Sequence, residues 1–388
     1  MPIINSINEK LDEIVAWRRD FHAHPELLYD VDRTAAKIAA LLESFGVDEV
    51  VTGIGRTGVV GVIRGRAGGR SIGLRADMDA LPINEATGLP HASTTPGLMH
   101  ACGHDGHSAM LLGAARHLAQ TRNFDGTIMV IFQPAEEGGA GGLAMADDGL
   151  FERFGIEAVY GMHNLPGLPE GSFATCTGAI MASADEFDIE ITAKGGHAAW
   201  PHEAIDPVLV AGHLITALQS IVARNVDPLA SAVISTTRME SGSAYNVIPS
   251  SARLSGTVRT LAPETRDTVE ARMNAVVTHI ASAFGASAKL DFRRGYPVTV
   301  NDPEHTRFAC KIAQDIVGPD KVNPDLVPMM GGEDFAFMLE RRPGAYIFIG
   351  NGQTSGLHTD TYDFNDDIIP MGVSYLVRLG EAAASGRT

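Results

Sequence analysis

Two hydrophobic patterns run along the chain, and the first is a series of short, nearly continuous apolar runs. These runs lie at residues 59–65, 71–77, 126–134, 157–163 and 344–351. They are typical of strands that are buried on both faces of a sheet. Residues with helical spacing occupy the segments 5–23, 33–46, 106–120 and 367–383. Because strands alternate with helices, this pattern predicts an α/β sandwich.

The middle of the chain has a different pattern. Residues 184–194 alternate between apolar and polar, with Phe187, Ile189 and Ile191 on one face. The segments expected after this strand are a helix at 205–224, strands near 230–239 and 251–260, a helix from Pro263 and a strand at 287–295. This β-α-β-β-α-β order is the ferredoxin-like arrangement. We therefore expect a ferredoxin-like domain at 182–294, inserted into a mixed-sheet α/β domain formed by residues 1–181 and 295–388.

Length and charge narrow the possible partners. A chain of 388 residues exceeds what one hydrophobic core usually serves, which agrees with two domains. The formal net charge of −17 argues against nucleic acid and anionic membrane surfaces as partners. No apolar run approaches the roughly 18 residues of a membrane span, and the N-terminal residues lack a signal-peptide core. The three well-separated cysteines fit a reducing compartment, so we expect a cytoplasmic protein.

Polar residues gather where the predicted strands end. They occupy residues 75–77, 133–139, 161–164 and 356–366. In open α/β sheets, ligands bind beyond the carboxyl ends of the strands. The candidate metal ligands are Cys102, His104, one glutamate of the pair 136–137, His163 and His358. This mixture of thiolate, imidazole and carboxylate suits Zn²⁺, Mn²⁺, Co²⁺ or Ni²⁺, and its size suits two ions that share a bridging ligand.

Cys102 and His104 stand just before the predicted helix at 106–120. Two residues apart, they would diverge on a regular helix, so we expect both in the turn that leads into it. The dipole and free N–H groups at the start of a helix favour a thiolate. We expect Cys102 to benefit from this effect.

The adjacent residues Glu136 and Glu137 lie in a predicted loop, where neighbouring side chains point in different directions. One carboxylate can bind metal while the other takes a proton from an activated water and passes it to a leaving amine. A bound metal and a carboxylate that transfers a proton are the groups that amide hydrolysis requires at minimum. Asp77 and Asp79, at the end of a predicted strand, are expected to orient a ligand histidine.

For several other polar residues, the sequence is compatible with two different roles. His24, His100 and His107 flank the motifs and are either ordinary histidines or partners that hold the tautomers of ligand histidines. Glu333 and Asp334 follow two glycines and either cap a helix or lie near the metals. The other histidines outside the candidate site are interpreted as surface or hydrogen-bonded residues.

A series of motifs carries a resemblance to a known family. The motifs are RADMDALP, MHACGHDGHSAML, FQPAEEGGAGG, GMHN, KGGHAAWPH, NVIPSSARLSGTVRT, GGEDFAF and GLHTDTYDFND. In this order they resemble the M20 family of metallopeptidases and amidohydrolases. The match is closest to the branch of hippurate hydrolases, N-acyl-amino-acid amidohydrolases and indole-acetyl-amino-acid hydrolases. It extends from residues 22–26 to the C-terminal helix, which is nearly the whole chain.

The resemblance implies a role for each candidate metal ligand. The implied ligands of two divalent ions are the bridging residue Cys102 together with His104, Glu137, His163 and His358. Glu136 is implied to be the general base and acid. Many family members have a histidine ligand in place of Asp77 and an aspartate bridge in place of Cys102, but the branch that this chain resembles shares both changes.

The resemblance also assigns roles to the inserted domain. It implies a lid and dimerisation domain that brings His197 and Asn246 to the site. Arg259 stands where related enzymes bind a substrate carboxylate. The implied assembly is a homodimer or a dimer of dimers. In related dimeric enzymes this histidine comes from the partner subunit, and the alternatives for His197 are a role within its own chain or an ordinary surface position.

These observations favour a dinuclear metal amidohydrolase that cleaves an N-acyl amino acid into a carboxylic acid and an amino acid. A dipeptidase or aminopeptidase of the same fold is the main alternative. A binding or scaffold protein with a degenerate site would lack Glu136 or two ligands, and all are present. A TIM-barrel amidohydrolase would need the HAH motif at 22–24 to follow a strand, whereas here it ends a predicted helix.

Overall fold

The computed structural model describes residues 3–386, which divide into two compact units. Unit 1 comprises Met1–Ile180, Val300–Val327 and Asp334–Thr388, and unit 2 comprises Met181–Thr299 and Pro328–Glu333. The segment 328–333 belongs to unit 2 because Met329 and Gly331 accept hydrogen bonds from the backbone N–H of Ala182. Sequence pattern alone placed that segment with the C-terminal part of the larger domain.

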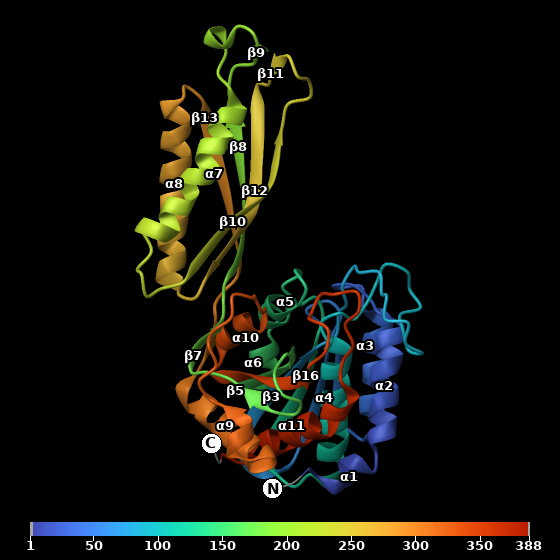
Figure 1. Ribbon diagram of the computed structural model, residues 1–388. Coiled ribbons are helices and arrows are strands. Elements are labelled where there is room, and N and C mark those ends of the chain that lie inside the picture. The colour runs from blue at the N-terminus through green and yellow to red at the C-terminus, as the bar shows by residue number, and fades with distance from the viewer. Residues whose placement is uncertain (1–2, 387–388) are drawn as a thin grey trace. The chain divides into compact units, whose positions relative to one another are not determined.

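Unit 1 is built on one eight-stranded sheet (Figure 1). Its strands are, in order across the sheet, β1 (Glu49–Ile54), β2 (Gly58–Arg64), β4 (Asp125–Gln133), β3 (Arg66–Asp77), β5 (Ala158–Pro166), β16 (Gly344–Gly352), β6 (Phe173–Ala174) and β15 (Val322–Asn323). The central strands β4, β3, β5 and β16 run parallel, whereas β2 is antiparallel to both of its neighbours. The predicted α/β class with a mixed sheet is therefore confirmed.

Helices cover both faces of this sheet. They are α1 (Asn5–Asn8), α2 (Leu11–Ala23), α3 (Asp32–Ser44), α4 (His104–Thr121), α5 (Gly141–Asp147), α6 (Leu150–Phe154), α9 (Pro303–Val317), α10 (Phe335–Arg341) and α11 (Ile369–Ala384), with the short 3₁₀ turns η2 (Pro319–Lys321) and η3 (Asp366–Ile368). Leu74 of β3 packs near α11 on one face, whereas Arg75 lies over the ring of Phe335 in α10 on the other. The single helix predicted at 5–23 is divided into α1 and α2.

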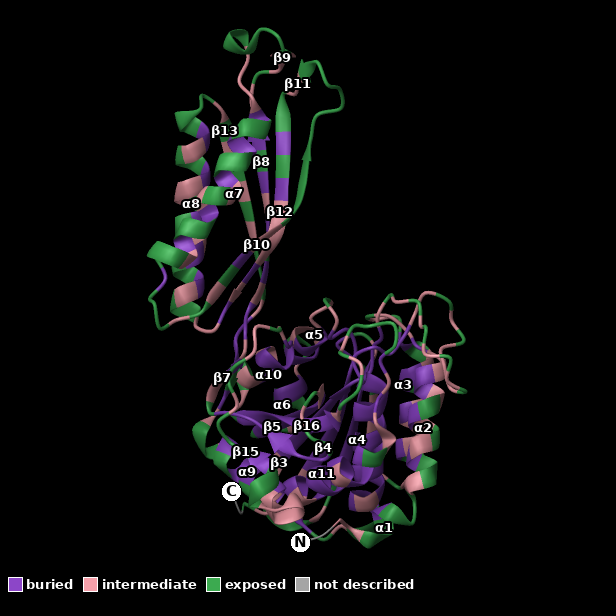
Figure 2. Ribbon diagram, viewed as in Figure 1, coloured by how far each residue is buried: buried purple, intermediate pink, exposed green. Residues whose placement is uncertain are grey.

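Helix α4 is buried along most of its length (Figure 2). It packs against β3, α2 and α11, so nearly every residue along it is buried. Its first residue is His104, which places the start of a buried helix at the carboxyl ends of the parallel strands.

Unit 2 has its own sheet and core. Its main elements are β8 (Ala184–Thr192), α7 (Pro207–Arg224), β10 (Ala232–Ser241), β12 (Ser251–Thr260), α8 (Pro263–Ala283) and β13 (Ser287–Tyr296). The four strands are antiparallel in the order β10-β12-β8-β13. Phe187, Ile189 and Ile191 of β8 are buried in one hydrophobic cluster with residues of α7 and α8.

Short elements complete the structure. At one end of unit 2, β9 (Gly196–His197) pairs with β11 (Val247–Ile248), beside the 3₁₀ turn η1 (Pro201–Glu203). The strands β7 (Gly178–Met181) and β14 (Thr299–Asn301) pair where the chain passes from one unit to the other.

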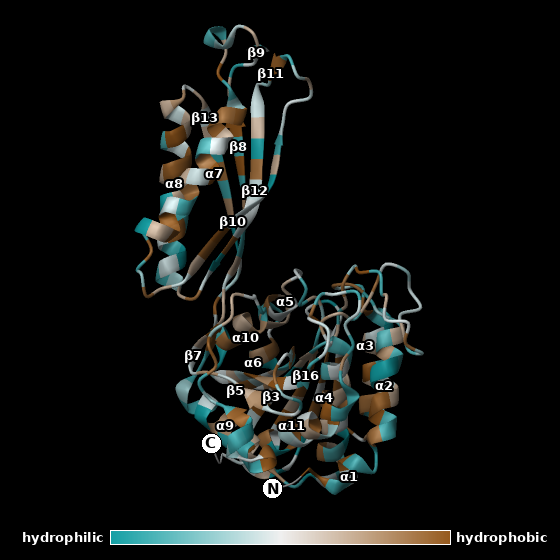
Figure 3. Ribbon diagram, viewed as in Figure 1, coloured by the Kyte–Doolittle hydropathy of each residue, from teal (hydrophilic) through white to brown (hydrophobic). Residues whose placement is uncertain are grey.

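Among the described residues, one helix, α7, is long and apolar enough to cross a membrane by length and composition (Figure 3). Its buried residues, which include Val210, Leu214 and Leu218, pack in the core of unit 2, whereas Val208 and Leu209 are exposed. The cytoplasmic location expected from the cysteines stays a prediction.

Candidate metal centre

The candidate ligands lie at the carboxyl ends of the parallel strands of unit 1. His163 lies in β5, and Glu137 lies in the loop that follows β4. Cys102 lies in the turn that leads into α4, as expected, whereas His104 is the first residue of the helix, which begins two residues earlier than predicted. His358 lies in the loop after β16, with a positive φ of 61°. Segments far apart in the sequence therefore meet at one edge of the sheet.

Two groups of three ligands share one cysteine. In the group that we call the inner subsite, the ligand atoms of Cys102, His104 and His163 all lie within 4.8 Å of one another. In the group that we call the outer subsite, the same limit holds for Cys102, Glu137 and His358. The Sγ atom of Cys102 is 3.3 Å from Nε2 of His163, and Oε1 of Glu137 is 3.2 Å from Nε2 of His358.

The histidines of the inner subsite are oriented for metal binding. Nδ1 of His104 donates a hydrogen bond to the carbonyl of Asp79 (2.8 Å), and Nδ1 of His163 donates to the carbonyl of Asn164 (2.6 Å). Each ring therefore presents Nε2 to the ligand cluster. Nε2 of His104 is buried and makes no hydrogen bond to any residue that the structure describes. A buried nitrogen of this kind is unusual without a partner, so the donor set fits a divalent metal ion.

Burial and charge shift the pKa values of these ligands. Burial lowers the pKa of His104, but Asp77 and Asp79 outweigh it and raise that pKa to about 10. Burial, with the carboxylates of Glu137 and Glu136, raises the pKa of the Cys102 thiol well above its usual value. The expectation that the helix start alone would favour a thiolate is therefore wrong for the metal-free chain. A cation is needed to stabilise the thiolate, and metal binding should release protons.

Asp79 holds the two adjacent glutamates in position. Its carboxylate accepts hydrogen bonds from the backbone N–H groups of Glu136 (2.9 Å) and Glu137 (3.1 Å). Glu137 points toward the ligands, with Oε1 4.0 Å from Nε2 of His104. Glu136 is buried, and its carboxylate accepts a hydrogen bond from the backbone N–H of Asp334 (3.4 Å). The carboxylate of Glu137 can therefore bind metal, while the carboxylate of Glu136 lies next to the ligands and can take another role.

Arg75 is the centre of a buried network that sequence reasoning missed. Its guanidinium donates to Asp77 (2.7 Å), Gln133 (2.9 Å) and Asp334 (3.1 Å). The carboxylate of Asp334 also accepts from the backbone N–H of Gly142 (2.8 Å), so it pairs with Arg75 and makes no hydrogen bond that caps α10. The available signal was an arginine within an otherwise apolar strand, at the start of the RAD motif.

The flanking histidines differ in their surroundings. His107 is buried and contacts Asp77 and Asn164. His100 is buried too, and neither of its ring nitrogens makes a hydrogen bond within residues 3–386. His24 is partly exposed and donates to the backbone carbonyl of Asp20. Of the three, His107 alone makes hydrogen bonds to the residues around the ligands.

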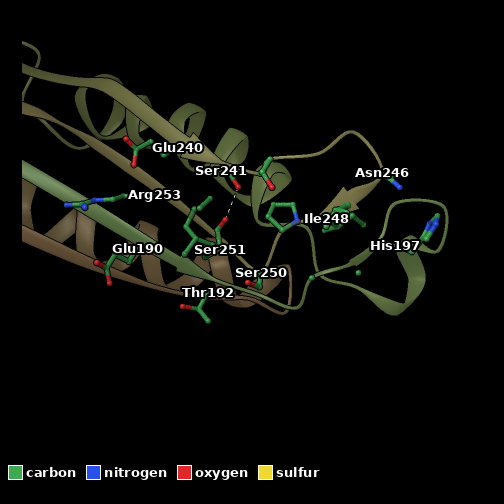
Figure 4. A pocket seen from close by; sticks show the side chains of 18 residues that line it. Glu190, Thr192, His197, Glu240, Ser241, Asn246, Ile248, Ser250, Ser251 and Arg253 are labelled. Atoms are coloured by element: carbon green, nitrogen blue, oxygen red, sulfur yellow. Dashed lines mark hydrogen bonds between the residues drawn. The ribbon is translucent and has the colours of Figure 1, made fainter.

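The remaining candidate residues lie in unit 2. His197 in β9 pairs with Val247 in β11, and the backbone N–H of Ala198 donates to the carbonyl of Asn246 (3.0 Å). His197 and Asn246 line a cavity of about 1140 Å³ together with residues of β8, β10 and β12. Figure 4 shows these two residues at one end of the group of lining side chains. Both residues are exposed.

Arg259 lies at the opposite end of β12 from this cavity, paired with Val233. With about 3.3 Å per strand residue, it is roughly 25 Å along the strand from Ser251, which lines the cavity. The structure therefore does not bring Asn246 and Arg259 of one chain together.

Two triads share the Cys102 thiol at the carboxyl edge of a mixed sheet, one completed by two imidazoles and the other by a carboxylate and an imidazole. Such a donor set is typical of a metal-dependent hydrolase. Comparison with known proteins identifies the family. The model of peptidase family M20/M25/M40 matches residues 73–382.

Individual relatives match over almost their whole length. The chain is 43% identical to a hippurate hydrolase of Campylobacter jejuni, covering 97% of this chain and 98% of the relative. It is 40% identical to an N-acetylcysteine deacetylase of Bacillus subtilis, covering 94% and 95%. The structure of a dinuclear metal-binding M20 peptidase from Bacillus subtilis superimposes with a TM-score of 0.86 at 35% identity, covering 97% and 99%. The chain belongs to the M20 family, which confirms the family and the amide-bond hydrolase predicted from the motifs.

Proposed function

We propose that this protein hydrolyses the amide bond of N-acyl amino acids, releasing a carboxylic acid and a free amino acid. The observation that carries the proposal is the pair of ligand triads that share Cys102, with Glu136 beside them. The names of the hippurate hydrolase and the N-acetylcysteine deacetylase support the same substrate class.

The proposed cofactors are two divalent ions, with Zn²⁺, Mn²⁺, Co²⁺ or Ni²⁺ as the candidates, and Cys102, which both triads share, would contribute to both subsites. When bound, such ions lower the pKa of water and polarise the scissile carbonyl. The inner ligands are His104 and His163, and the outer ligands are Glu137 and His358.

Glu136 is the proposed general base and general acid. Its carboxylate takes one proton from the attacking water as the new C–O bond forms at the amide carbon. The same proton then passes to the amide nitrogen as the C–N bond breaks, so the amine leaves neutral and Glu136 is again ionised. Asp79 keeps Glu136 in place through the backbone hydrogen bond at 2.9 Å.

Unit 2 is the proposed ferredoxin-like lid and dimerisation domain, in a homodimer or a dimer of dimers. His197 would donate a hydrogen bond to the developing oxyanion, and Asn246 would contact the substrate beside it. Arg259 would bind the substrate carboxylate through its planar guanidinium. Because Arg259 lies at the far end of β12 from His197 and Asn246, one unit 2 cannot present all three to one substrate. Two chains can do so, which supports a contribution from the partner subunit.

Metal analysis combined with a hydrolysis screen tests this function. The purified protein should contain divalent metal, and it should hydrolyse N-acetyl or N-benzoyl amino acids faster than free dipeptides. Chelation should reduce the rate by more than ~10³-fold, and Zn²⁺, Mn²⁺, Co²⁺ or Ni²⁺ should restore it. Full activity of the metal-free protein would contradict the proposal. Faster hydrolysis of dipeptides would favour the peptidase alternative.

A further inference from the structure

His107 lies on α4 one turn after His104, and both of its ring nitrogens are engaged. Nδ1 donates a hydrogen bond to Oδ1 of Asp77 (2.6 Å), and Nε2 accepts one from the backbone N–H of Asn164 (3.1 Å). Nε2 also lies 2.8 Å from the side-chain oxygen Oδ1 of Asn164, which is an acceptor. Both ring nitrogens of His107 therefore have partners within the protein.

The hydrogen bonds continue in both directions through buried side chains. Asp77 accepts from Arg75 at 2.7 Å, and the side-chain amide of Asn164 donates to the hydroxyl of Tyr362 at 2.6 Å. Asp77, His107, Asn164 and Tyr362, which we call the His107 relay, are each at most 2% exposed. A fully satisfied buried network of this kind is rigid, because each lost partner would leave a buried polar group alone.

The relay touches both chain segments that carry the inner subsite. Asn164 follows His163 and accepts a hydrogen bond from the Nδ1 of that histidine, whose ring centroid is 4.4 Å from that of His107. Gly103, between Cys102 and His104, has a φ of 92°, and a Cβ there would lie 2.2 Å from Oδ1 of Asn164. The turn that carries Cys102 and His104 is therefore packed directly on the relay.

The ligands of the outer subsite are more exposed and have fewer buried hydrogen-bond partners than those of the inner subsite. The side chain of His358 is 53% exposed and that of Glu137 is 11% exposed. His358 lies in a loop, whereas His104 and His163 lie in a helix and a strand. Ligands held by rigid, buried partners bind metal more tightly than mobile ones, because less freedom is lost on binding.

His107 could itself be considered a ligand, since Asp77, His104 and His107 form another group whose donor atoms lie within 4.8 Å. The hydrogen bonds argue against this role. Both nitrogens of His107 have protein partners, whereas Nε2 of His104 makes no hydrogen bond within the described part of the chain.

We propose that His107 is a positioning residue that holds Cys102, His104 and His163 in place, and that the inner subsite therefore binds its ion more tightly than the outer subsite. This inference rests on the two-ion site of the proposed function. It concerns how the chain distributes affinity between the ions and not which substrate is cleaved.

A graded removal of metal tests the inference. The full-length protein is loaded with Co²⁺ and dialysed against increasing chelator, while metal per chain and the Co²⁺ absorption spectrum are measured. The wild type should lose its ions in two steps. In His107→Gln, the step at higher chelator should move to roughly 10–100-fold weaker binding, whereas the first step should stay in place.

Two further variants keep the test decisive. Tyr362→Phe removes only the far hydroxyl of the relay and should shift the same step in the same direction by a smaller factor. His22→Gln is the matched control, because His22 is also fully buried and bonded to a carboxylate, Asp105 at 2.8 Å. In this control, both steps of metal loss should occur at the same chelator concentrations as in the wild type.

Several results would overturn the inference. They are equal shifts of both steps in His107→Gln, no shift in either relay variant, or a shift of the same kind in the control. If His107→Gln abolished inner binding with the same spectrum as His163→Gln, then His107 would be a ligand. If His107→Gln failed to fold, an unshifted Tyr362→Phe would by itself contradict the proposal. A wild type that binds two ions in one step and still hydrolyses N-acyl amino acids would contradict this inference alone, whereas a wild type without metal-dependent hydrolysis would contradict the proposed function.

Discussion

The candidate residues of unit 1 and those of unit 2 differ in burial and in the hydrogen bonds that hold their side chains. In unit 1, His104 and His163 are buried, and a backbone carbonyl holds each ring. In unit 2, His197 and Asn246 are exposed, beside an open cavity and a two-residue pairing of strands. Metal ligands must be held rigidly before the metal arrives, whereas a lid residue must remain accessible until substrate and a partner surface cover it. The comparison indicates preorganised ligands in unit 1, and the proposed role of His197 and Asn246 requires further surfaces around them.

The largest expected effect separates the two glutamates of the preorganised unit. Glu136→Gln removes the base but keeps the shape, so kcat should fall by ~10²–10⁴-fold while metal content holds. Glu137→Gln should lower metal affinity, because Glu137 Oε1 faces His358 at 3.2 Å. The measurements are steady-state rates and metal per chain for both variants. If Glu136→Gln lost metal and Glu137→Gln kept it, the two roles would be exchanged.

The next effect tests whether unit 2 is completed by a partner. His197→Ala should lower kcat by ~10²–10³-fold, the usual loss for one oxyanion donor, without changing metal content. Mixing His197→Ala with Glu136→Gln should restore activity, because each mixed dimer then has one site with both residues intact. Absence of recovery after verified subunit exchange would mean that His197 acts within its own chain or has no role.

A smaller effect concerns the far end of β12. Arg259 is expected to recognise the free carboxylate, so an N-acyl amino acid should be cleaved ~10–100-fold better than its carboxamide, the usual size of a charged hydrogen bond. Arg259→Ala should remove most of this preference, whereas Arg253→Ala, an exposed arginine of the same strand, should keep it. Equal kcat/KM values for free and blocked substrates in the wild type would contradict the assignment.

The smallest effect on activity is expected from substitution of His22, which forms a buried pair with Asp105 in unit 1. This substitution should have a measurable effect on stability. Burial lowers the pKa of His22, but Asp105 and Glu85 outweigh it and raise that pKa to about 9. Protonated His22 therefore stabilises the folded state fully below pH 6.5, and this stability is lost as the pH rises through about 9. The thermal unfolding midpoint of the wild type should fall as the pH rises from 6.5 to about 9. The fall should be smaller in His22→Gln. His202→Gln, an exposed histidine of unit 2, should keep the wild-type dependence.

Local sequence determined much of the fold and the ligand set. The apolar runs of unit 1 became β2, β3, β4, β5 and β16, because strands buried on both faces have no polar side to obscure the pattern. The alternation at 184–194 became β8, with its apolar face in the core of unit 2. Short elements such as β6, β15 and α10 were missed, since two to seven residues carry too little periodicity.

Only the tertiary structure decided which polar residues act on one another. Cys102 and His104 could be chosen from their spacing, but their partners lie tens to hundreds of residues away, and chain proximity says nothing about those pairs. The roles of Asn164 and Tyr362 beneath Gly103, and of Arg75 between Asp77 and Asp334, depend on that packing. The distance between Asn246 and Arg259 likewise follows from the length of β12, because an extended strand separates residues that sequence order places close together.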